Sequence, residues 1–243
     1  MNINFIAEKS NAYVVSEWRE RHLRKDGAGE VALNPAITFS YQTGVGMREI
    51  AERLAQALHA IEPRDDREWM VFDQQLIEKA LDENFLPREL AGRITEDKRL
   101  FLDELVDDLF GLCPPSWVLV PQVVQTILRL AVGGHVILIG HGVTIVTAKL
   151  PNVYHVRLTG SLPRRIARVQ HLRNFTPKEA AQYVHEKDRG RERYVKAHFH
   201  TRLDDEMHYD LVLNTDRFSA NDAAALVAAG AHCFFAATNG SAS

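Results

Sequence analysis

Cysteine is scarce in this chain, and the signals of secretion and membrane insertion are missing. On number alone Cys113 and Cys233 could form a disulfide. However, no basic segment followed by an apolar run opens the chain, so we expect two buried thiols in a reducing cytoplasm instead. No run approaches the roughly 18 apolar residues that cross a bilayer, which predicts no membrane partner. A net charge of −3 also argues against a protein built around nucleic-acid binding.

Charge is nonetheless unevenly distributed in a composition that is otherwise ordinary for a globular protein, with 46% hydrophobic and 25% charged residues. Residues 73–108 carry 11 acidic and 5 basic side chains, whereas residues 157–202 carry 12 Lys or Arg and 4 acids. A basic block inside a mildly acidic protein indicates an anionic ligand. A solvated helical face is the alternative interpretation.

Short runs rich in β-branched and aromatic residues predict five β-strands: 36–40, 69–73, 135–140, 153–159 and 209–214. Segments with helical spacing lie between these runs. Because strands alternate with helices, we expect an α/β fold whose sheet is parallel. Ligands of such sheets bind at the carboxyl ends of the strands.

The expected helices carry start and stop signals. Apolar residues recur with helical period in three segments: 50–58, 100–109 and 120–131. Gly133-Gly134 follows the last of these and is a natural helix stop. Two capping patterns mark later helix starts: Thr176 with Glu179, and Ser219 with Asp222.

A glycine-containing turn, residues 40–49, joins the first expected strand to the first helix. Glycines there let backbone N–H groups and the helix N-terminus point at a phosphate. The Rossmann pattern begins at Gly44 and Gly46 but meets Glu49 instead of its third glycine. The Walker A pattern, anchored on Gly46, has its glycine, lysine and hydroxyl positions replaced by Tyr41, Met47 and Arg48. A tight turn without a ligand is the third interpretation.

Several motifs recur in the order, and at about the spacing, of one family: 42–55, 72–73, 139–142, 155–157, 164–169, 187–191 and 209–215. Together they resemble the cytidylate kinase-like family of P-loop proteins, over roughly residues 36–229. The resemblance implies a P-loop NTPase fold, a three-layer α/β/α structure with a five-stranded parallel sheet and a helical lid. We therefore expect these regions: an N-terminal extension (1–34), a kinase-like domain (35–232) with an acceptor-side helical segment (84–131) and a lid region (170–205), and a C-terminal tail (233–243).

The activity that the resemblance implies is transfer of the γ-phosphoryl group of ATP, with Mg²⁺, to a small acceptor such as CMP. Such a transfer requires positioning and positive charge around the phosphate oxygens. The residues expected to form the phosphate loop are Gln42, Thr43, Gly44, Val45, Gly46, Met47, Arg48 and Glu49.

Two positions of this loop depart from well-characterised cytidylate kinases. Those enzymes have a lysine where Met47 stands; the wider family typically lacks it and carries an arginine at the place of Arg48, the candidate replacement cation. Glu49 stands where a Mg²⁺-binding hydroxyl is usual. It either binds the metal or, as a first-turn acid, interacts with the helix dipole.

Four arginines of the basic block are candidates for the phosphates. Arg165 and Arg168 lie three residues apart, on one face of the expected helix. Arg189 and Arg191 match the family's lid, where they are candidate catalytic residues, and Arg189 is also expected to contact the acceptor. Asp188 is expected to orient a lid arginine. Guanidinium groups suit phosphate oxygens, and a closing lid brings them to the ligand.

Asp73 and His141 are the candidates on the acceptor side. Asp73 ends the second expected strand, where it would meet the acceptor or a metal-bound water, or would cap a helix over 74–83. His141 lies between Gly140 and Gly142, where cytidylate kinases typically have Gly-Arg-Asp, whose arginine and aspartate contact CMP. The loss of both groups weakens the case for CMP, although a histidine can still bond an acceptor.

Other functions stay open at this point. Met47, Glu49 and Gly142 favour a nucleotide-binding regulatory protein without turnover. A dinucleotide-binding oxidoreductase is disfavoured by Glu49 and by the arginine-rich lid. A zinc site at His198, His200 and His208 is disfavoured because residues two apart in sequence rarely share an ion. No pattern in the sequence indicates an oligomeric state.

Overall fold

The computed structural model describes residues 33–61, 67–73 and 121–240. The segments 1–32, 62–66, 74–120 and 241–243 lie outside these residues. With them lie most of the expected N-terminal extension (1–34) and of the acceptor-side segment (84–131), the expected helices at 74–83 and 100–109, and Cys113. The described elements, in chain order, are β1 (Ala36–Tyr41), α2 (Met47–Ile61), β2 (Met70–Phe72), α6 (Pro121–Gly133), β3 (Val136–Ile139), α7 (Val143–Val146), β4 (Val153–Thr159), α8 (Leu162–Arg173), α9 (Pro177–Phe199), η2 (Glu206–His208), β5 (Leu211–Asn214), η3 (Thr215–Arg217) and α10 (Ala220–Gly240).

The five strands form one parallel sheet in the order β2-β3-β1-β4-β5. All five expected strands are present, with ends that shift by no more than two residues. β1 lies in the centre, where Phe39 pairs with Ile139 of β3 and with Val156 of β4. The central strands are apolar on both sides because helices cover both faces of the sheet.

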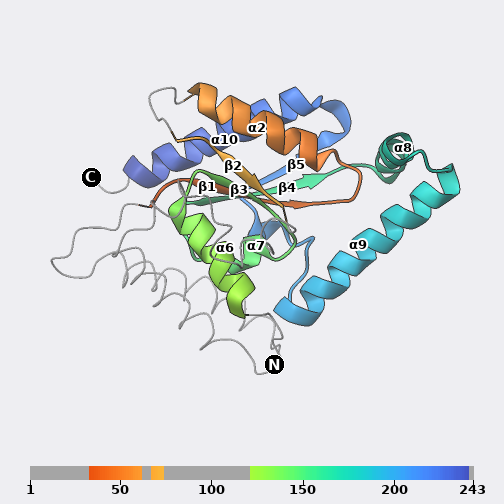
Figure 1. The fold of residues 1–243 in the computed structure, drawn as a ribbon, viewed down its shortest axis with the longest axis horizontal. Helices are drawn as coiled ribbons and strands as arrows, with labels where there is room; N and C mark the ends of the chain where they lie inside the picture. Colours follow the sequence, from red (N-terminus) through yellow and green to blue (C-terminus); the bar gives the residue numbers. More distant parts are fainter. Residues whose placement is uncertain (1–32, 62–66, 74–120, 241–243) are drawn as a thin grey trace.

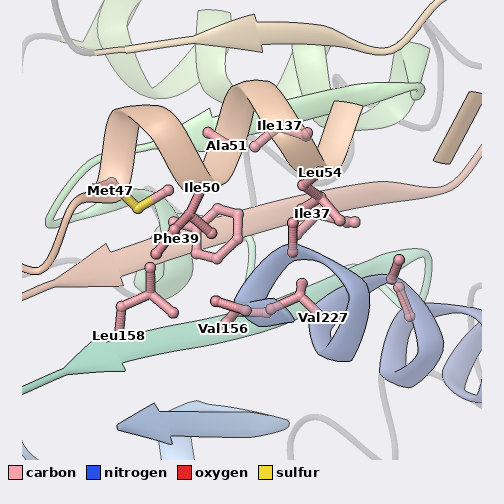
Figure 2. Close-up of a cluster of buried hydrophobic side chains, with 14 of the residues drawn as sticks. Ile37, Phe39, Met47, Ile50, Ala51, Leu54, Ile137, Val156, Leu158 and Val227 are labelled. Atoms are coloured by element: carbon pink, nitrogen blue, oxygen red, sulfur yellow. The ribbon is translucent and has the colours of Figure 1, made fainter. Parts of the chain in front are cut away.

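The helices form two outer layers, as Figure 1 shows: α2 and α10 lie on one face of the sheet, α6 and α7 on the other. On the first face, Ile37 and Phe39 of β1 pack with Leu54 of α2 and Val227 of α10 (Figure 2). On the second face, Val136 and Leu138 of β3 join the core side chains of α6 and α7. The three-layer arrangement expected from the sequence is therefore confirmed.

The sequence signals for helix ends are also confirmed. At the start of α9, the Thr176 N–H donates to Glu179 Oε2 at 2.8 Å, and the Glu179 N–H donates back to Thr176 Oγ1 at 3.3 Å. Ser219 and Asp222 make the same reciprocal pair before α10, at 3.2 Å in each direction. Gly134, with φ of +73°, follows the last residue of α6. These signals succeed because capping depends on residues only three positions apart.

α10 differs most from expectation. It continues to Gly240, so residues 233–240 of the expected C-terminal tail are helical. Cys233 is exposed, not buried. By length and hydropathy the segment Ala220–Thr238 could span a membrane, although the sequence analysis expected no such segment. Its inner face nevertheless consists of core residues that pack toward α2 and the sheet: Ala223, Ala224, Val227, Ala228 and Ala231.

α8 and α9 follow β4 and extend beyond the edge of the sheet (Figure 1). They pack on each other through the small buried cluster Val169, Ala180 and Val184. At its other end, α9 is anchored by Val195 and Phe199, which join the core beside α6 and α7. The expected lid region, 170–205, thus corresponds to the end of α8 and the whole of α9.

Candidate phosphate-binding site

The turn between β1 and α2 has the backbone of a phosphate-binding loop. Gly44 and Gly46 adopt φ angles of +91° and +85°, a region that favours glycine. A Cβ at Gly44 would lie 2.5 Å from the carbonyl oxygen of Arg165, and one at Gly46 would lie 2.6 Å from Arg168 Nη1. Glycine is therefore required both for the conformation of the turn and for the close approach of α8. Because α2 begins at Met47, the positive end of its dipole also lies at this turn.

α8 holds the first half of the loop through a buried arginine. Arg165 is 7% exposed and donates from Nη1 to the Thr43 carbonyl at 3.1 Å and from Nε to the Gly160 carbonyl at 2.9 Å. The Gly160 N–H in turn donates to Gln42 Oε1 at 3.0 Å. These bonds fix the loop to the end of β4.

Asp188 joins the same loop to α9. Its Oδ1 accepts from the Thr43 N–H at 2.8 Å, and its Oδ2 accepts from Arg165 Nη1 at 2.6 Å. Arg191, one helical turn further along, lies 3.5 Å from Oδ1. Asp188 thus contacts the lid arginine Arg191, as expected, and also Arg165 of α8, which precedes the lid region. A backbone N–H of the loop thus already holds an oxyanion.

Arg191 reaches the loop from α9. Its Nη1 donates to Thr43 Oγ1 at 2.8 Å and to the Tyr41 carbonyl at 3.3 Å. Its guanidinium carbon also lies 4.3 Å from the centre of the Tyr41 ring, a cation–π contact. The third arginine at the loop is Arg168 of α8, which lies over Gly46, is exposed and makes no hydrogen bond or ion pair with another described residue.

His141 lies beside this group, with its ring 5.3 Å from that of Tyr41. Burial, and then the positive charge of Arg191, lowers the pKa of His141 to about 3, against a weaker opposing effect of Asp188. The imidazole is therefore neutral near pH 7. Its Nδ1 is buried and has no hydrogen-bond partner within the described ranges.

Arg189 does not join the other three arginines. It is exposed, and two residues from Arg191 it projects about 200° around the helix. The expected roles in catalysis and acceptor contact therefore have no geometric support in this arrangement. Asp73 is likewise exposed at the end of β2, with β3 between it and the loop strand β1.

The residues at the start of α2 also differ from the roles expected of them. The Met47 side chain is 6% exposed and packs into the apolar cluster with Phe39 and Ile50 (Figure 2). The Arg48 side chain is 92% exposed, and its Nε donates to Glu52 at 3.1 Å, so the candidate replacement cation is paired within α2.

The described residues offer no ready-made metal site. Glu49 is exposed in the first turn of α2, a position that suits the interaction with the helix dipole. Within residues 33–61, 67–73 and 121–240, no three His, Cys, Asp or Glu side chains are grouped so that they could hold a metal ion. Mg²⁺ commonly takes only one or two carboxylates and otherwise relies on phosphate oxygens and water, so Glu49 alone is compatible with it.

Sequence reasoning missed two residues of this region. Tyr41 counted only as a departure from the Walker A pattern, and its contact with Arg191 depends on the placement of a helix 150 residues later. Arg157 appeared only inside a motif. It carries a charge at an inward-facing position of a buried strand, and that signal was visible in the sequence.

The parallel sheet, the glycine turn that leads into a helix, and the arginines of the two helices after β4 define the arrangement of a P-loop kinase. The chain belongs to the cytidylate kinase-like family, whose model matches residues 36–217. This match confirms the resemblance found in the sequence.

One of two similar solved structures supports the fold. An uncharacterized protein from Eubacterium ventriosum ATCC 27560 superposes with a TM-score of 0.62 at 15% identity, over 82% of this chain and 99% of that one. Shikimate kinase from Bacteroides thetaiotaomicron matches with a TM-score of 0.38 at 12% identity, over 79% of this chain and 95% of that one. The comparison with curated proteins found no match.

Proposed function

We propose that this chain transfers the γ-phosphoryl group of ATP to a small acceptor, with nucleoside monophosphates such as CMP as the first candidates. One observation carries the proposal: Arg165, Arg168 and Arg191, from two helices after β4, converge on the glycine turn. Positive charge beside the backbone N–H groups of such a turn suits the crowded oxygens of a triphosphate. Membership of the family supports a kinase-like activity.

ATP, when bound, supplies the phosphoryl group. The N–H groups from Thr43 to Arg48 would hold its phosphate oxygens, and Arg168 and Arg191 would neutralise their charge. Arg165 would act differently, because its donors are engaged by Asp188 and by two backbone carbonyls. It would position the loop and Asp188 rather than bind the nucleotide.

Asp188 and a nucleotide phosphate would compete for the Thr43 N–H. In the structure this N–H is bonded to the carboxylate. A phosphate that takes its place would release Asp188, and with it one of the contacts that hold α9 on the loop. We expect a lid that rearranges as the nucleotide enters.

A screen of nucleoside monophosphates with ATP and Mg²⁺ tests the proposal, and two neighbouring arginines of α9 give a matched comparison. Arg191 contacts the loop, whereas Arg193 is exposed and, among the described residues, bonds only the carbonyl of Arg189. With an active acceptor, Arg191→Ala should lower kcat/KM by about 100-fold, as the loss of one oxyanion donor does elsewhere. Arg193→Ala should leave it unchanged. Absence of transfer to every acceptor, or equal losses in both variants, would contradict the proposal.

A second candidate function is nucleotide binding that regulates another process, without turnover. The burial of Met47 and the pairing of Arg48 with Glu52 favour it, because neither residue supplies the cation that a phosphate loop normally carries. The same screen separates the two functions. Binding of ATP without transfer to any acceptor would support the regulatory role, and turnover with any of them would exclude it.

The surroundings in which the protein works are also part of the proposal. We propose a cytoplasmic protein that binds a nucleotide and a small acceptor and that has neither membrane nor specific nucleic-acid partners. The packing of the small residues of α10 into the core supports this, as does the net charge of −3.

A further inference from the structure

Arg157 is a buried charge that makes no ion pair with a described carboxylate. It lies on β4 and is 8% exposed, about as buried as Arg165 at 7%. Arg165 is paired with Asp188 at 2.6 Å. Arg157 instead donates from Nη1 to two neutral oxygens, Ser40 Oγ and Tyr209 Oη, each at 3.2 Å. No carboxylate of the described residues forms an ion pair with it.

The hydrogen-bond partners of Arg157 are polar and neutral, although two carboxylates lie in the wider surroundings: Asp204, whose pKa Arg157 helps to lower, and Asp210, 3.7 Å from His155 Nδ1. His155 lies on the same face of β4, two residues earlier, and burial lowers the pKa of its imidazole to about 4. Thr147 of α7 lies 3.5 Å from His155 Nε2, and Thr144 lies 3.4 Å from Thr38 of β1. A buried guanidinium loses part of its hydration, and neutral hydrogen-bond partners do not fully replace it. An anionic ligand would therefore stabilise such a group more than a neutral ligand would.

One edge of the Arg157 guanidinium remains available. Both of these hydrogen bonds use Nη1, and neither Nε nor Nη2 bonds a described residue. The Nε–Nη2 edge carries parallel N–H donors, the geometry with which arginine binds a carboxylate or a phosphate through two hydrogen bonds. Arg165 lacks such an edge, because its Nε is bonded to Gly160.

A second unsatisfied group and further positive charge lie nearby. His141 Nδ1 is buried without a partner among the described residues. The positive charges of Arg191 and Arg157 both lower the pKa of His141. His141 follows β3, Tyr41 ends β1, and Arg157 is near the end of β4. These are the carboxyl ends of adjacent strands, where parallel sheets bind ligands.

We propose that Arg157 binds the oxyanion of the acceptor through its Nε–Nη2 edge, with His141 Nδ1 as a second hydrogen-bonding group. This inference rests on the proposed function and narrows the class of acceptor. Acceptors of the reaction carry a phosphate or a carboxylate, and uncharged molecules such as nucleosides are not acceptors. The reactive end of the acceptor then lies beside the loop that holds the donor, because Arg157 pairs in register with Ser40, two residues before Gln42.

Entry to this site requires a movement of α9. Arg191 of α9 covers Tyr41, and the Phe199 ring lies against Gly142, where a Cβ would be only 2.7 Å from it. Donor and acceptor sites are therefore covered by the same helix. Nucleotide binding that displaces Asp188 from the loop would loosen the part of this cover that Arg191 forms, whereas Phe199 would stay in the core.

Calorimetric titration of the full chain tests the proposal, with a non-hydrolysable ATP analogue keeping the loop filled. The probes are CMP, cytidine, inorganic phosphate and acetate, at constant ionic strength. Arg157→Met is the main variant, because an apolar side chain of similar size often replaces a buried charge without loss of folding. Arg157→Lys keeps the charge but not the paired donors. The control is Arg173→Met, which removes an exposed arginine that packs on Tyr183 of the lid.

We expect the wild-type protein and the control to bind CMP more tightly than cytidine. Arg157→Met should weaken CMP binding by at least about tenfold, the equivalent of one charged hydrogen bond, and should leave cytidine binding unchanged. The phosphate and acetate arms show which oxyanion the site prefers. Arg157→Lys, which should fold even if the methionine variant does not, is expected to bind CMP more weakly than the wild type.

Equal CMP affinity in the wild type and both Arg157 variants would overturn the proposal, as would a wild-type protein that binds none of the oxyanions. Binding of the ATP analogue is measured separately in each variant. If the analogue binds normally while CMP affinity is insensitive to residue 157, only the acceptor site is wrong. If the wild-type protein does not bind the analogue, the proposed kinase function itself fails.

Discussion

Gly44 has no side chain, and both the conformation of the loop and the packing of α8 require this. Its φ is +91°, and an added Cβ would meet the backbone of Arg165 at 2.5 Å, where no side chain can rotate away. We expect Gly44→Ala to lower the free energy of unfolding by about 1–3 kcal/mol, the range for a strained backbone position. Urea unfolding measures it.

Gly190 provides the matched control for this prediction. It lies within α9, and a Cβ there would have nothing within 4 Å. Gly190→Ala should raise stability by about 0.5–1 kcal/mol, because alanine favours the helix. If the two substitutions changed stability equally, strain at Gly44 would not be the cause.

His141 and His155 predict how stability changes with pH. Burial is the main reason that the pKa values of both histidines fall from 6.5, to about 3 for His141 and about 4 for His155. Below pH 6.5 the unfolded chain therefore binds protons that the folded chain does not. The free energy of unfolding should fall as pH decreases from 6.5 toward 4, by up to about 1.4 kcal/mol per pH unit for each histidine.

Urea unfolding at pH 7, 6 and 5 measures this slope. His155→Asn should remove one of the two contributions and flatten the profile, whatever it does to stability at pH 7. A profile that is equally steep without His155 would mean that other groups cause the acid sensitivity.

At the scale of elements, Asp188 is the side chain that connects α9 to the loop and to α8. It pairs with Arg165, whose side chain is 9% exposed, while its own is 20% exposed. Asp188→Asn would leave that guanidinium without its charged partner. We expect a loss of about 2 kcal/mol in the free energy of unfolding, as for a hydrogen bond to a charged group.

Asp204 gives the comparison. It pairs with Arg202 at 2.7 Å, but these side chains are 61% and 77% exposed. Asp204→Asn should therefore change stability by less than about 1 kcal/mol, as is usual for surface ion pairs. A larger loss in Asp204→Asn than in Asp188→Asn would show that burial does not determine the strength of these pairs.

The elements show which features a sequence reveals and which it conceals. The strands, the glycine turn and both capping pairs were predictable, because each depends on residues close together in the chain. The length of α10 was not predictable, because its alanine-rich end resembles an irregular tail in the sequence, and only the structure shows that the helix continues through it. The inward orientation of the Met47 side chain, and the contact of Arg191 rather than Arg189 with the loop, depend on which face of a helix meets a distant partner. Composition and spacing do not determine that face.

At the scale of the whole molecule, the lid is fastened at two places of different character. Near its middle, α9 is held by Asp188 and Arg191, polar contacts that a ligand anion can replace. At its end, Val195 and Phe199 belong to the main core, and His200 then terminates the helix with φ of +52°. A ligand can replace the polar contacts of Asp188 and Arg191 while the apolar contacts of Val195 and Phe199 stay in place. We therefore expect α9 to pivot near its C-terminal end.

Hydrogen exchange with and without the ATP analogue tests this division. Binding should change the protection of the loop, residues 42–48, and of the part of α9 around residues 183–192, because Asp188 exchanges places with a phosphate there. The end of α9 near Phe199 and the inner face of α10 should be unaffected, since their apolar contacts involve no ligand group. Uniform protection across the sheet and both ends of α9 would instead indicate general stabilisation by mass action, and the two-point attachment would be wrong.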